Sequence, residues 1–183
     1  MGIITKIGKL LLNSGIIPDC FKKIIVVPIP KKSRGNIQSK ARPINLCSNI
    51  VKGWERVAKK QIEPMLEGNN LFKQAQHGFR NTRSTITCLT RIKKRIEDLE
   101  NEGAHMICLD FAKGFVTVDH EVLIEEADEA GIEDKAHLWL TNWILDNKFQ
   151  WRLDEKLSDS RTITSGCKQG SCLGPLAFII FIK

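Results

Sequence analysis

One carboxylate stands out in this sequence as a residue that could do chemistry. Asp110 lies in the run Ile107–Phe111, whose other members are apolar or cysteine. An ionised carboxylate in an apolar strand costs free energy unless it is hydrogen-bonded, paired or bound to a cation. The residues alone leave two interpretations of Asp110 open: a cation ligand, or a residue at a strand end that turns into solvent.

The residue types common in zinc and haem sites give weaker signals. The six cysteines form no Cys-x-x-Cys pair, and no histidine lies at zinc-finger spacing from them. His77 is interpreted as structural, and the other three histidines show no metal-ligand spacing to one another. Nothing marks the chain as secreted, so we expect a soluble intracellular protein with reduced, mostly buried thiols. The apolar run 176–182 is too short to cross a bilayer, so no membrane association is expected.

The charge balance is basic. The 183 residues include 28 Lys and Arg against 21 Asp and Glu, a net charge of +7. This excess is compatible with a polyanionic partner such as nucleic acid, because Lys and Arg neutralise phosphates. Hydrophobic residues make up 42% of the chain, enough for a globular core. The length fits one ordinary domain or most of a larger one.

The elements that must position these residues are a mixture of helices and strands. Apolar residues at three- and four-residue steps predict helices, with N-caps at Ser48 and Asp119 and a start near Ser84. We expect helices over 3–12, 48–66, 84–99, 119–130 and 135–145, and strands over 21–29, 104–111, 149–153 and 161–164, the last two as a hairpin. Three sets of residues are expected to be buried. They are the strand 104–111, the residues Leu138, Trp139 and Ile144, and one face of the helix 84–99, formed by Ile86, Leu89, Ile92, Ile96 and Leu99. The pattern alone indicates an α+β or α/β fold.

Four blocks of the sequence resemble the reverse transcriptases of non-LTR retrotransposons, in that family's order and with similar spacing. They are Ala41–Leu46, Gln76–Arg80 with Arg83–Thr85, Leu109–His120 (motif A) and Ser165–Leu176 (motif B). The resemblance runs from about Pro18 to Ile182. It implies an α+β fold with the fingers and a partial palm of a right-hand polymerase, the thumb being absent. On this interpretation 1–183 is a partial reverse transcriptase domain, with a fingers-like region over about 18–102 and a partial palm over about 103–183.

The resemblance also implies a chemistry for Asp110. It would be the catalytic carboxylate that binds Mg²⁺, or Mn²⁺ in its place, in a two-metal phosphoryl transfer. The backbone carbonyl of Phe111 would be a second metal ligand. The implied partners are an RNA template, a DNA primer and a deoxynucleoside triphosphate.

Further roles follow from the same resemblance. Arg42 would contact the triphosphate, as would Lys31 or Lys32, because a guanidinium pairs with phosphate oxygens bidentately. Phe115 would lie under the incoming sugar. Gln169 and Gly170 would contact the nascent base pair and template, with glycine allowing close backbone approach. Without the resemblance, core packing for Phe115 and an ordinary basic loop for the two lysines remain open.

The sequence also departs from the family pattern. Val116 stands where members commonly have Asp, and Lys168 where they commonly have a proline that fixes the backbone. The family's motif C, a Tyr-x-Asp-Asp-like hairpin, lies downstream of motif B, and this sequence contains no Tyr and no Asp-Asp pair. We therefore expect that the chain by itself does not polymerise.

Three hypotheses remain at this point. The first is a fragment of an RNA-directed DNA polymerase from a non-LTR retrotransposon, inactive as this chain. The second is a non-catalytic nucleic-acid-binding remnant of a degenerate element. The third is a chain without function, made insoluble by an exposed sheet edge. The sequence indicates neither a template preference nor an oligomeric state.

Overall fold

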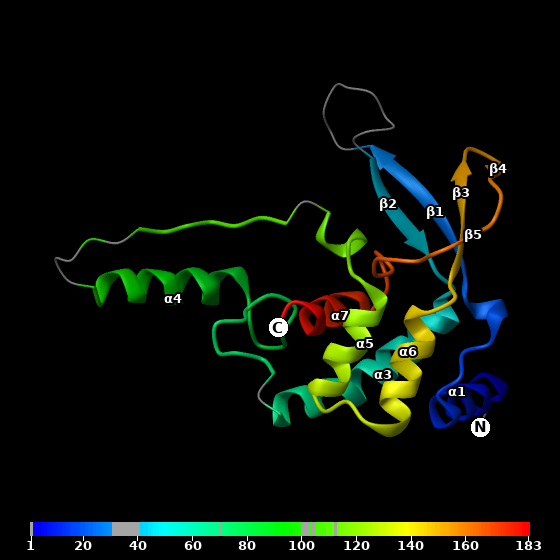
Figure 1. Ribbon diagram of the computed structural model, residues 1–183, viewed down its shortest axis with the longest axis horizontal. Coiled ribbons are helices and arrows are strands. Elements are labelled where there is room, and N and C mark those ends of the chain that lie inside the picture. The colour runs from blue at the N-terminus through cyan, green and yellow to red at the C-terminus, as the bar shows by residue number, and fades with distance from the viewer. Residues whose placement is uncertain (1, 31–40, 70, 100–102, 104, 112) are drawn as a thin grey trace.

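The computed structural model describes residues 2–30, 41–69, 71–99, 103, 105–111 and 113–183, which form a helical body, a small sheet and an extended arm (Figure 1). Lys31 and Lys32 lie outside the described residues. The helices are α1 (Ile3–Ser14), α3 (Asn49–Gly68), α4 (Thr85–Glu97), α5 (His120–Glu129), α6 (Asp134–Ile144) and α7 (Gly174–Phe181), with short 3-10 helices at Asp19–Phe21 and Gly114–Val116. The strands are β1 (Lys23–Pro30), β2 (Ala41–Leu46), β3 (Lys148–Leu153), β4 (Lys156–Leu157) and β5 (Arg161–Thr162).

The core of the body lies between α3, α5, α6 and α7, with α1 packed against α3 and α6. Its side chains come from segments far apart in sequence, and many are almost completely removed from solvent; the largest include Ile62, Leu66, Leu123, Leu140, Trp143, Leu176 and Ile180. Burial of this kind is the main favourable term in folding. None of the described helices is long and apolar enough to cross a membrane.

Helix starts follow from local side-chain chemistry, as predicted. The Ser48 hydroxyl accepts a hydrogen bond from the Ile50 N–H, and Ser84 forms a reciprocal capping box with Thr87. Asp119 accepts from two backbone N–H groups in the first turn of α5. These groups satisfy donors that a helix leaves unpaired at its N-terminus.

The sheet has the order β2-β1-β3-β4, and β5 also pairs with β3. Strands β1 and β2 are antiparallel, with Ile25 opposite Leu46, whereas β1 and β3 are parallel. The predicted hairpin is confirmed, because β3 and β5 are antiparallel with Phe149 opposite Arg161. The intervening turn adds β4, which pairs with the far end of β3.

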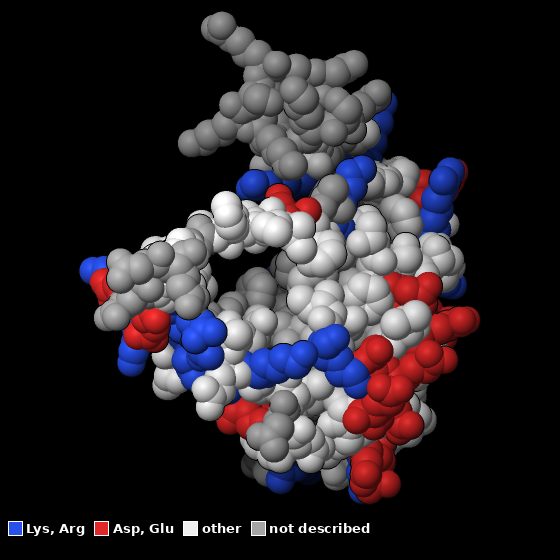
Figure 2. Space-filling model, turned by 60° about the vertical axis from the view of Figure 1, so that its left-hand side comes forward, with Lys and Arg blue, Asp and Glu red and all other residues white. Residues whose placement is uncertain are grey.

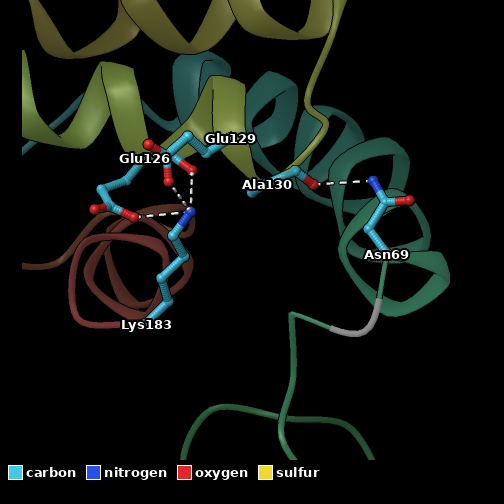
Figure 3. A network of polar contacts seen from close by, with 5 residues as sticks. All are labelled: Asn69, Glu126, Glu129, Ala130 and Lys183. Carbon is cyan, nitrogen blue, oxygen red and sulfur yellow. Dashed lines mark hydrogen bonds and ion pairs between the residues drawn. The ribbon is translucent and has the colours of Figure 1, made fainter.

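Polar contacts join the ends of the body helices (Figure 3). Lys183 Nζ lies 2.8 Å from Glu126 Oε2 and 3.1 Å from Glu129 Oε2, which links α7 to α5. The Asn69 side chain donates to the Ala130 carbonyl at 2.9 Å, which links the end of α3 to the end of α5. Because these ion pairs are partly exposed, each contributes about 1 kcal/mol or less.

The arm, described over 71–99, 103 and 105–111, corrects two predictions of burial. The run 105–111 forms no strand, and Ile107 and Leu109 are 84% and 87% exposed. Helix α4 forms, but Ile86, Leu89, Ile92 and Ile96 are exposed and Leu99 is only partly covered. Both segments are exposed for the same physical reason, which is that they lack a packing partner. Within the described ranges no strand pairs with 105–111, and no helix or strand covers this face of α4.

Two smaller expectations were also wrong. Leu138 is 45% exposed, although Trp139 and Ile144 beside it are buried as predicted. The thiols were expected to be mostly buried, but of the six cysteines, all free, only Cys167 is buried.

Candidate active site

The loop 166–173, which precedes α7, is tied to several other parts of the molecule. The Gly166 N–H donates to the Val118 carbonyl at 2.7 Å, and the Cys167 N–H donates to the Phe115 carbonyl at 2.7 Å. On the other side, the Asn45 N–H of β2 donates to the Gln169 carbonyl at 3.0 Å. The loop is therefore held between the sheet and the turn that leads into α5.

Two glycines in the loop are required by its close contacts. Gly166 has a φ of 88°, and a Cβ there would lie 2.9 Å from the Val116 carbonyl oxygen. Gly170 has a φ of 102°, and a Cβ there would lie 3.2 Å from the Asn45 carbonyl oxygen. Only glycine adopts such angles at low cost. Gly170 therefore lies close to a neighbouring strand, and its approach to the template stays a prediction.

Phe115 is held by two other aromatic rings. It stacks on Phe178 of α7 with ring centroids 4.8 Å apart, and Phe79 meets it edge-on at 6.2 Å. Both arrangements suit the quadrupoles of aromatic rings. Phe115 is half-buried, so its ring both packs and faces the surface. Core packing and a role beside a sugar are thus compatible here.

A small pocket of about 160 Å³ joins several of these parts. Its lining includes Asn45 of β2, Phe149 of β3, Val116 and Gln169. Arg42 lies on β2 opposite Ile29 of β1 and is exposed. The structure therefore brings Gln169 together with the β2 strand that carries Arg42.

Asp110 is not part of this assembly. It lies in the exposed run 105–111, and no hydrogen bond to its carboxylate is found among the described residues. The backbone carbonyl of Phe111, the expected second ligand, belongs to the same run. Asp110 is exposed to solvent, which both interpretations of this residue allow, so its role as a cation ligand stays a prediction.

The described side chains do not fit a two-metal site. Among them, no three His, Cys, Asp or Glu residues converge as metal ligands. Two cations about 4 Å apart need several hard oxygen donors, and Asp110 with one carbonyl supplies too few.

Sequence reasoning missed a buried polar cluster behind the loop. Glu55 of α3 is completely buried, Lys168 of the loop is 5% exposed, and Trp143 of α6 lies between them in contact with both. A signal for Glu55 was present, because it falls on the same helical face as Val51, Ala58 and Ile62. Lys168 was noted only as a departure from the family pattern.

The titration of this cluster reflects its burial. Burial lowers the pKa of Lys168 to about 8, and the charge of Glu55 opposes that shift. Burial raises the pKa of Cys167 to about 12 and also raises the pKa of Cys47. Desolvation disfavours the charged form in each case. Neither thiol is activated as a nucleophile.

Acidic side chains are gathered on one part of the surface. In the face drawn in Figure 2, Asp and Glu gather at the lower right, whereas Lys and Arg lie in several places, including a band beside that acidic area. Between α4 and 105–108 lies a hollow of about 680 Å³ whose lining includes Arg91 and Arg95. Acidic residues are concentrated at 119–134, around α5.

Comparison with known proteins gives consistent matches. Residues 29–183 match the family described as reverse transcriptase (RNA-dependent DNA polymerase). The chain is 28% identical over 174 residues to the probable RNA-directed DNA polymerase from transposon BS of Drosophila melanogaster, covering 93% of this chain and 19% of that protein. It is 26% identical over 175 residues to the RNA-directed DNA polymerase from mobile element jockey of Drosophila melanogaster, covering 93% and 19%. The chain thus spans about a fifth of the length of these relatives.

A solved structure supports the same fold. Apo telomerase from Candida tropicalis, truncated from its C-terminal domain, superposes with a TM-score of 0.57 at 15% identity. The likeness covers 91% of this chain and 39% of the telomerase chain. At this identity the match shows the fold alone, and the mixed helix and sheet architecture agrees with the predicted fingers and palm.

Proposed function

The chain belongs to the reverse transcriptase family, in its non-LTR retrotransposon branch, and on that premise we propose that it forms the nucleotide-facing part of an RNA-directed DNA polymerase. The reaction of the whole enzyme would be template-directed nucleotidyl transfer. Family members generally use divalent metal ions, so Mg²⁺, with Mn²⁺ as a substitute, is the proposed cofactor. The proposed partners are an RNA template, a DNA primer and a deoxynucleoside triphosphate.

One observation supports this proposal most strongly: the loop 166–173 is fixed against β2 and against the turn at Phe115. In the proposed site, Gln169 and Gly170 face the nascent base pair and the template. Phe115, supported by Phe178, lies under the sugar. Arg42 binds the triphosphate because its planar guanidinium matches phosphate oxygens. Lys31 and Lys32, outside the described residues, are proposed to assist it.

The metal-binding part of the proposed site depends on Asp110 and the carbonyl of Phe111. In this chain they lie on an exposed run, and the donor set around them is too small for two metals. We therefore propose that the chain alone binds template–primer and nucleotide but does not extend the primer. The proposed division remains a fingers-like region over about 18–102 and a partial palm over about 103–183.

Charge supports a polyanionic partner on one side of the molecule. The net charge is +7, yet acidic residues are concentrated around α5. A nucleic-acid backbone is repelled by the acidic area and attracted to the basic one. The template–primer is therefore proposed to lie away from α5.

Binding and extension can be measured in one experiment. A fluorescent DNA primer annealed to an RNA template is titrated with the chain in Mg²⁺, with and without the complementary deoxynucleoside triphosphate. We expect salt-sensitive binding that the complementary nucleotide strengthens, and no primer extension. Arg42→Ala should weaken the nucleotide effect about tenfold, since one charge-assisted contact is lost. Arg56→Ala is the matched control, because Arg56 is also exposed but lies on α3 and not on β2, the strand that contacts Gln169.

Each result has a distinct meaning. Template-dependent synthesis that disappears in Asp110→Asn would contradict the proposed inactivity of this chain. Absence of any nucleotide effect, together with salt-sensitive binding that survives Asp110→Ala, would favour the alternative of a non-catalytic nucleic-acid-binding remnant. That alternative is favoured by the exposed position of Asp110.

A further inference from the structure

Glu55 is a charged residue that is completely buried, and its two carboxylate oxygens bind different elements. Oε1 accepts a hydrogen bond from Trp143 Nε1 of α6 at 2.8 Å. Oε2 accepts a hydrogen bond from the backbone N–H of Cys172, in the loop 166–173, at 2.7 Å. Glu55 itself lies on α3, so one side chain joins two helices and the loop.

The surroundings of Glu55 supply a compensating charge. Lys168, four residues before Cys172, is buried, and its Nζ lies 4.9 Å from the centroid of the Trp143 ring. The charge of Glu55 raises the pKa of Lys168 against the larger effect of burial. The other titratable groups that act on Lys168 are Cys47, Cys167 and Lys22. A buried carboxylate is tolerated when both of its oxygens accept hydrogen bonds and an opposite charge acts on it from nearby.

The contact with Cys172 occurs where the loop has few other hydrogen bonds to its surroundings, beside Leu173, which is packed in the core. Residues 166–173 form neither helix nor strand, so individual hydrogen bonds fix their position. The first half is tied at Gly166, Cys167 and Gln169. In the second half, one hydrogen bond joins the loop to another element among the described residues: the Cys172 N–H donates to Glu55. The adjoining turn is closed within itself, from Ser171 to Lys168.

We propose that Glu55 is a positioning residue of the nucleotide site: its carboxylate holds the second half of the loop in place and thereby sets where Gln169 and Gly170 face the substrate. This inference rests on the proposed function, since it assumes that Gln169 meets the nucleotide. A buried, hydrogen-bonded carboxylate is often no more stabilising than an apolar side chain at the same core position. A role in fixing one loop conformation explains why α3 carries a carboxylate at this core position.

The test compares Glu55→Gln with Glu63→Gln. Glutamine has nearly the shape of glutamate but one accepting oxygen, so it cannot accept from both Trp143 and Cys172. Glu63 lies two turns further along α3 and pairs only with Lys59 among the described residues, which makes it a matched control. Three quantities are measured: amide hydrogen exchange at Cys172, amide hydrogen exchange in α5, and affinity for the complementary deoxynucleoside triphosphate on an RNA–DNA template–primer.

In Glu55→Gln we expect exchange at Cys172 to rise about tenfold and nucleotide affinity to fall about tenfold, with less change in α5. Template–primer binding without nucleotide should fall less than nucleotide affinity, because most of it comes from phosphate contacts of basic side chains that the substitution leaves in place. A uniform rise of exchange in loop and α5 alike would mean that Glu55 only stabilises the fold, and would overturn the inference. Unchanged nucleotide affinity in a variant whose wild type binds nucleotide would also overturn it.

Two further results distinguish a failure of this inference from a failure of the proposed function or of the folding of the variant. If the wild type binds no nucleotide, the proposed function fails, and the exchange at Cys172 alone decides whether Glu55 positions the loop. If Glu55→Gln does not fold, the exchange of the Cys172 amide in the wild type becomes the deciding measurement. That amide should be protected relative to the exposed Gly170 amide, and equal exchange at the two positions would contradict the inference.

Discussion

Two irregular segments carry Gln169 and Gly170 in one case and Asp110 and Phe111 in the other, and they differ in how the rest of the molecule holds them. The loop 166–173 has hydrogen bonds to β2, to α3 and to the turn before α5. The run 105–111, which contains Asp110, is extended and exposed, although most of its side chains are apolar. Neither polarity nor regular structure therefore decides which segment is fixed. What decides it is whether other elements supply partners for the backbone.

The largest expected contrast comes from two matched isoleucine deletions. Ile180→Ala removes a completely buried side chain of α7 and should lower the free energy of unfolding by about 2–5 kcal/mol. Ile107→Ala removes a side chain that is 84% exposed and should change it by less than about 0.5 kcal/mol. Urea denaturation measures both. Similar losses for the two variants would show that 105–111 is packed, and would end the contrast.

The next contrast uses two glycines with left-handed backbone angles. Gly166→Ala places a Cβ against the Val116 backbone and should cost about 3 kcal/mol in unfolding free energy. Gly103 also has a positive φ, 70°, but no atom lies within 4 Å of the Cβ that Gly103→Ala would add. This substitution should therefore lower the unfolding free energy by only about 1 kcal/mol. Thermal or urea unfolding separates the two. Equal costs would mean that the close contact between the loop and Val116 is absent.

A smaller effect should appear in the pH dependence of stability. The pKa of Lys168 falls from 10.5 to about 8 on folding, so above pH 8 the unfolded chain binds more protons than the folded one. Stability from this group therefore rises with pH, by about 1 kcal/mol between pH 7 and 9. The raised pKa values of Cys47 and Cys167 act in the opposite direction as pH approaches 9.

The effect of Lys168 is isolated by subtraction. Subtracting the unfolding free energy of Lys168→Met from that of the wild type cancels the thiol contributions to a first approximation. This difference should change in favour of the wild type as pH rises. The pKa of His77 is lowered from 6.5, so it titrates below this range. A difference that stays flat from pH 7 to 9 would show that Lys168 is solvated.

Local structure could be predicted from the sequence because its signals lie within a few residues. Ser48, Ser84 and Asp119 cap the helices as expected, since the cap and its partner are two or three positions apart. The β-branched run at 21–29 formed β1 for the same reason. The family and its fold were predicted because four short blocks occur in order.

The remaining features depend on partners that are distant in sequence. The partners of Glu55 are Trp143 and Cys172, 88 and 117 residues away, so spacing alone could place Glu55 in the core without naming them. An apolar run such as 105–111 predicts burial only if something covers it. From the sequence alone Lys168 would be expected at the surface, whereas in the structure it is buried with its Nζ over the ring of Trp143 in α6. The roles of Arg42, Phe115 and Gln169 in substrate binding stay predictions.

Residue-resolved amide hydrogen exchange of the wild-type chain can decide whether one half of the proposed site is fixed while the segment with Asp110 is not. The amides of Gly166 and Cys167, which donate at 2.7 Å to Val118 and Phe115, should be protected. The amides from Met106 to Phe111 should exchange at rates typical of an unstructured chain. Comparable protection in the two segments would show that the loop and the Asp110 segment are held alike, against the difference proposed between them.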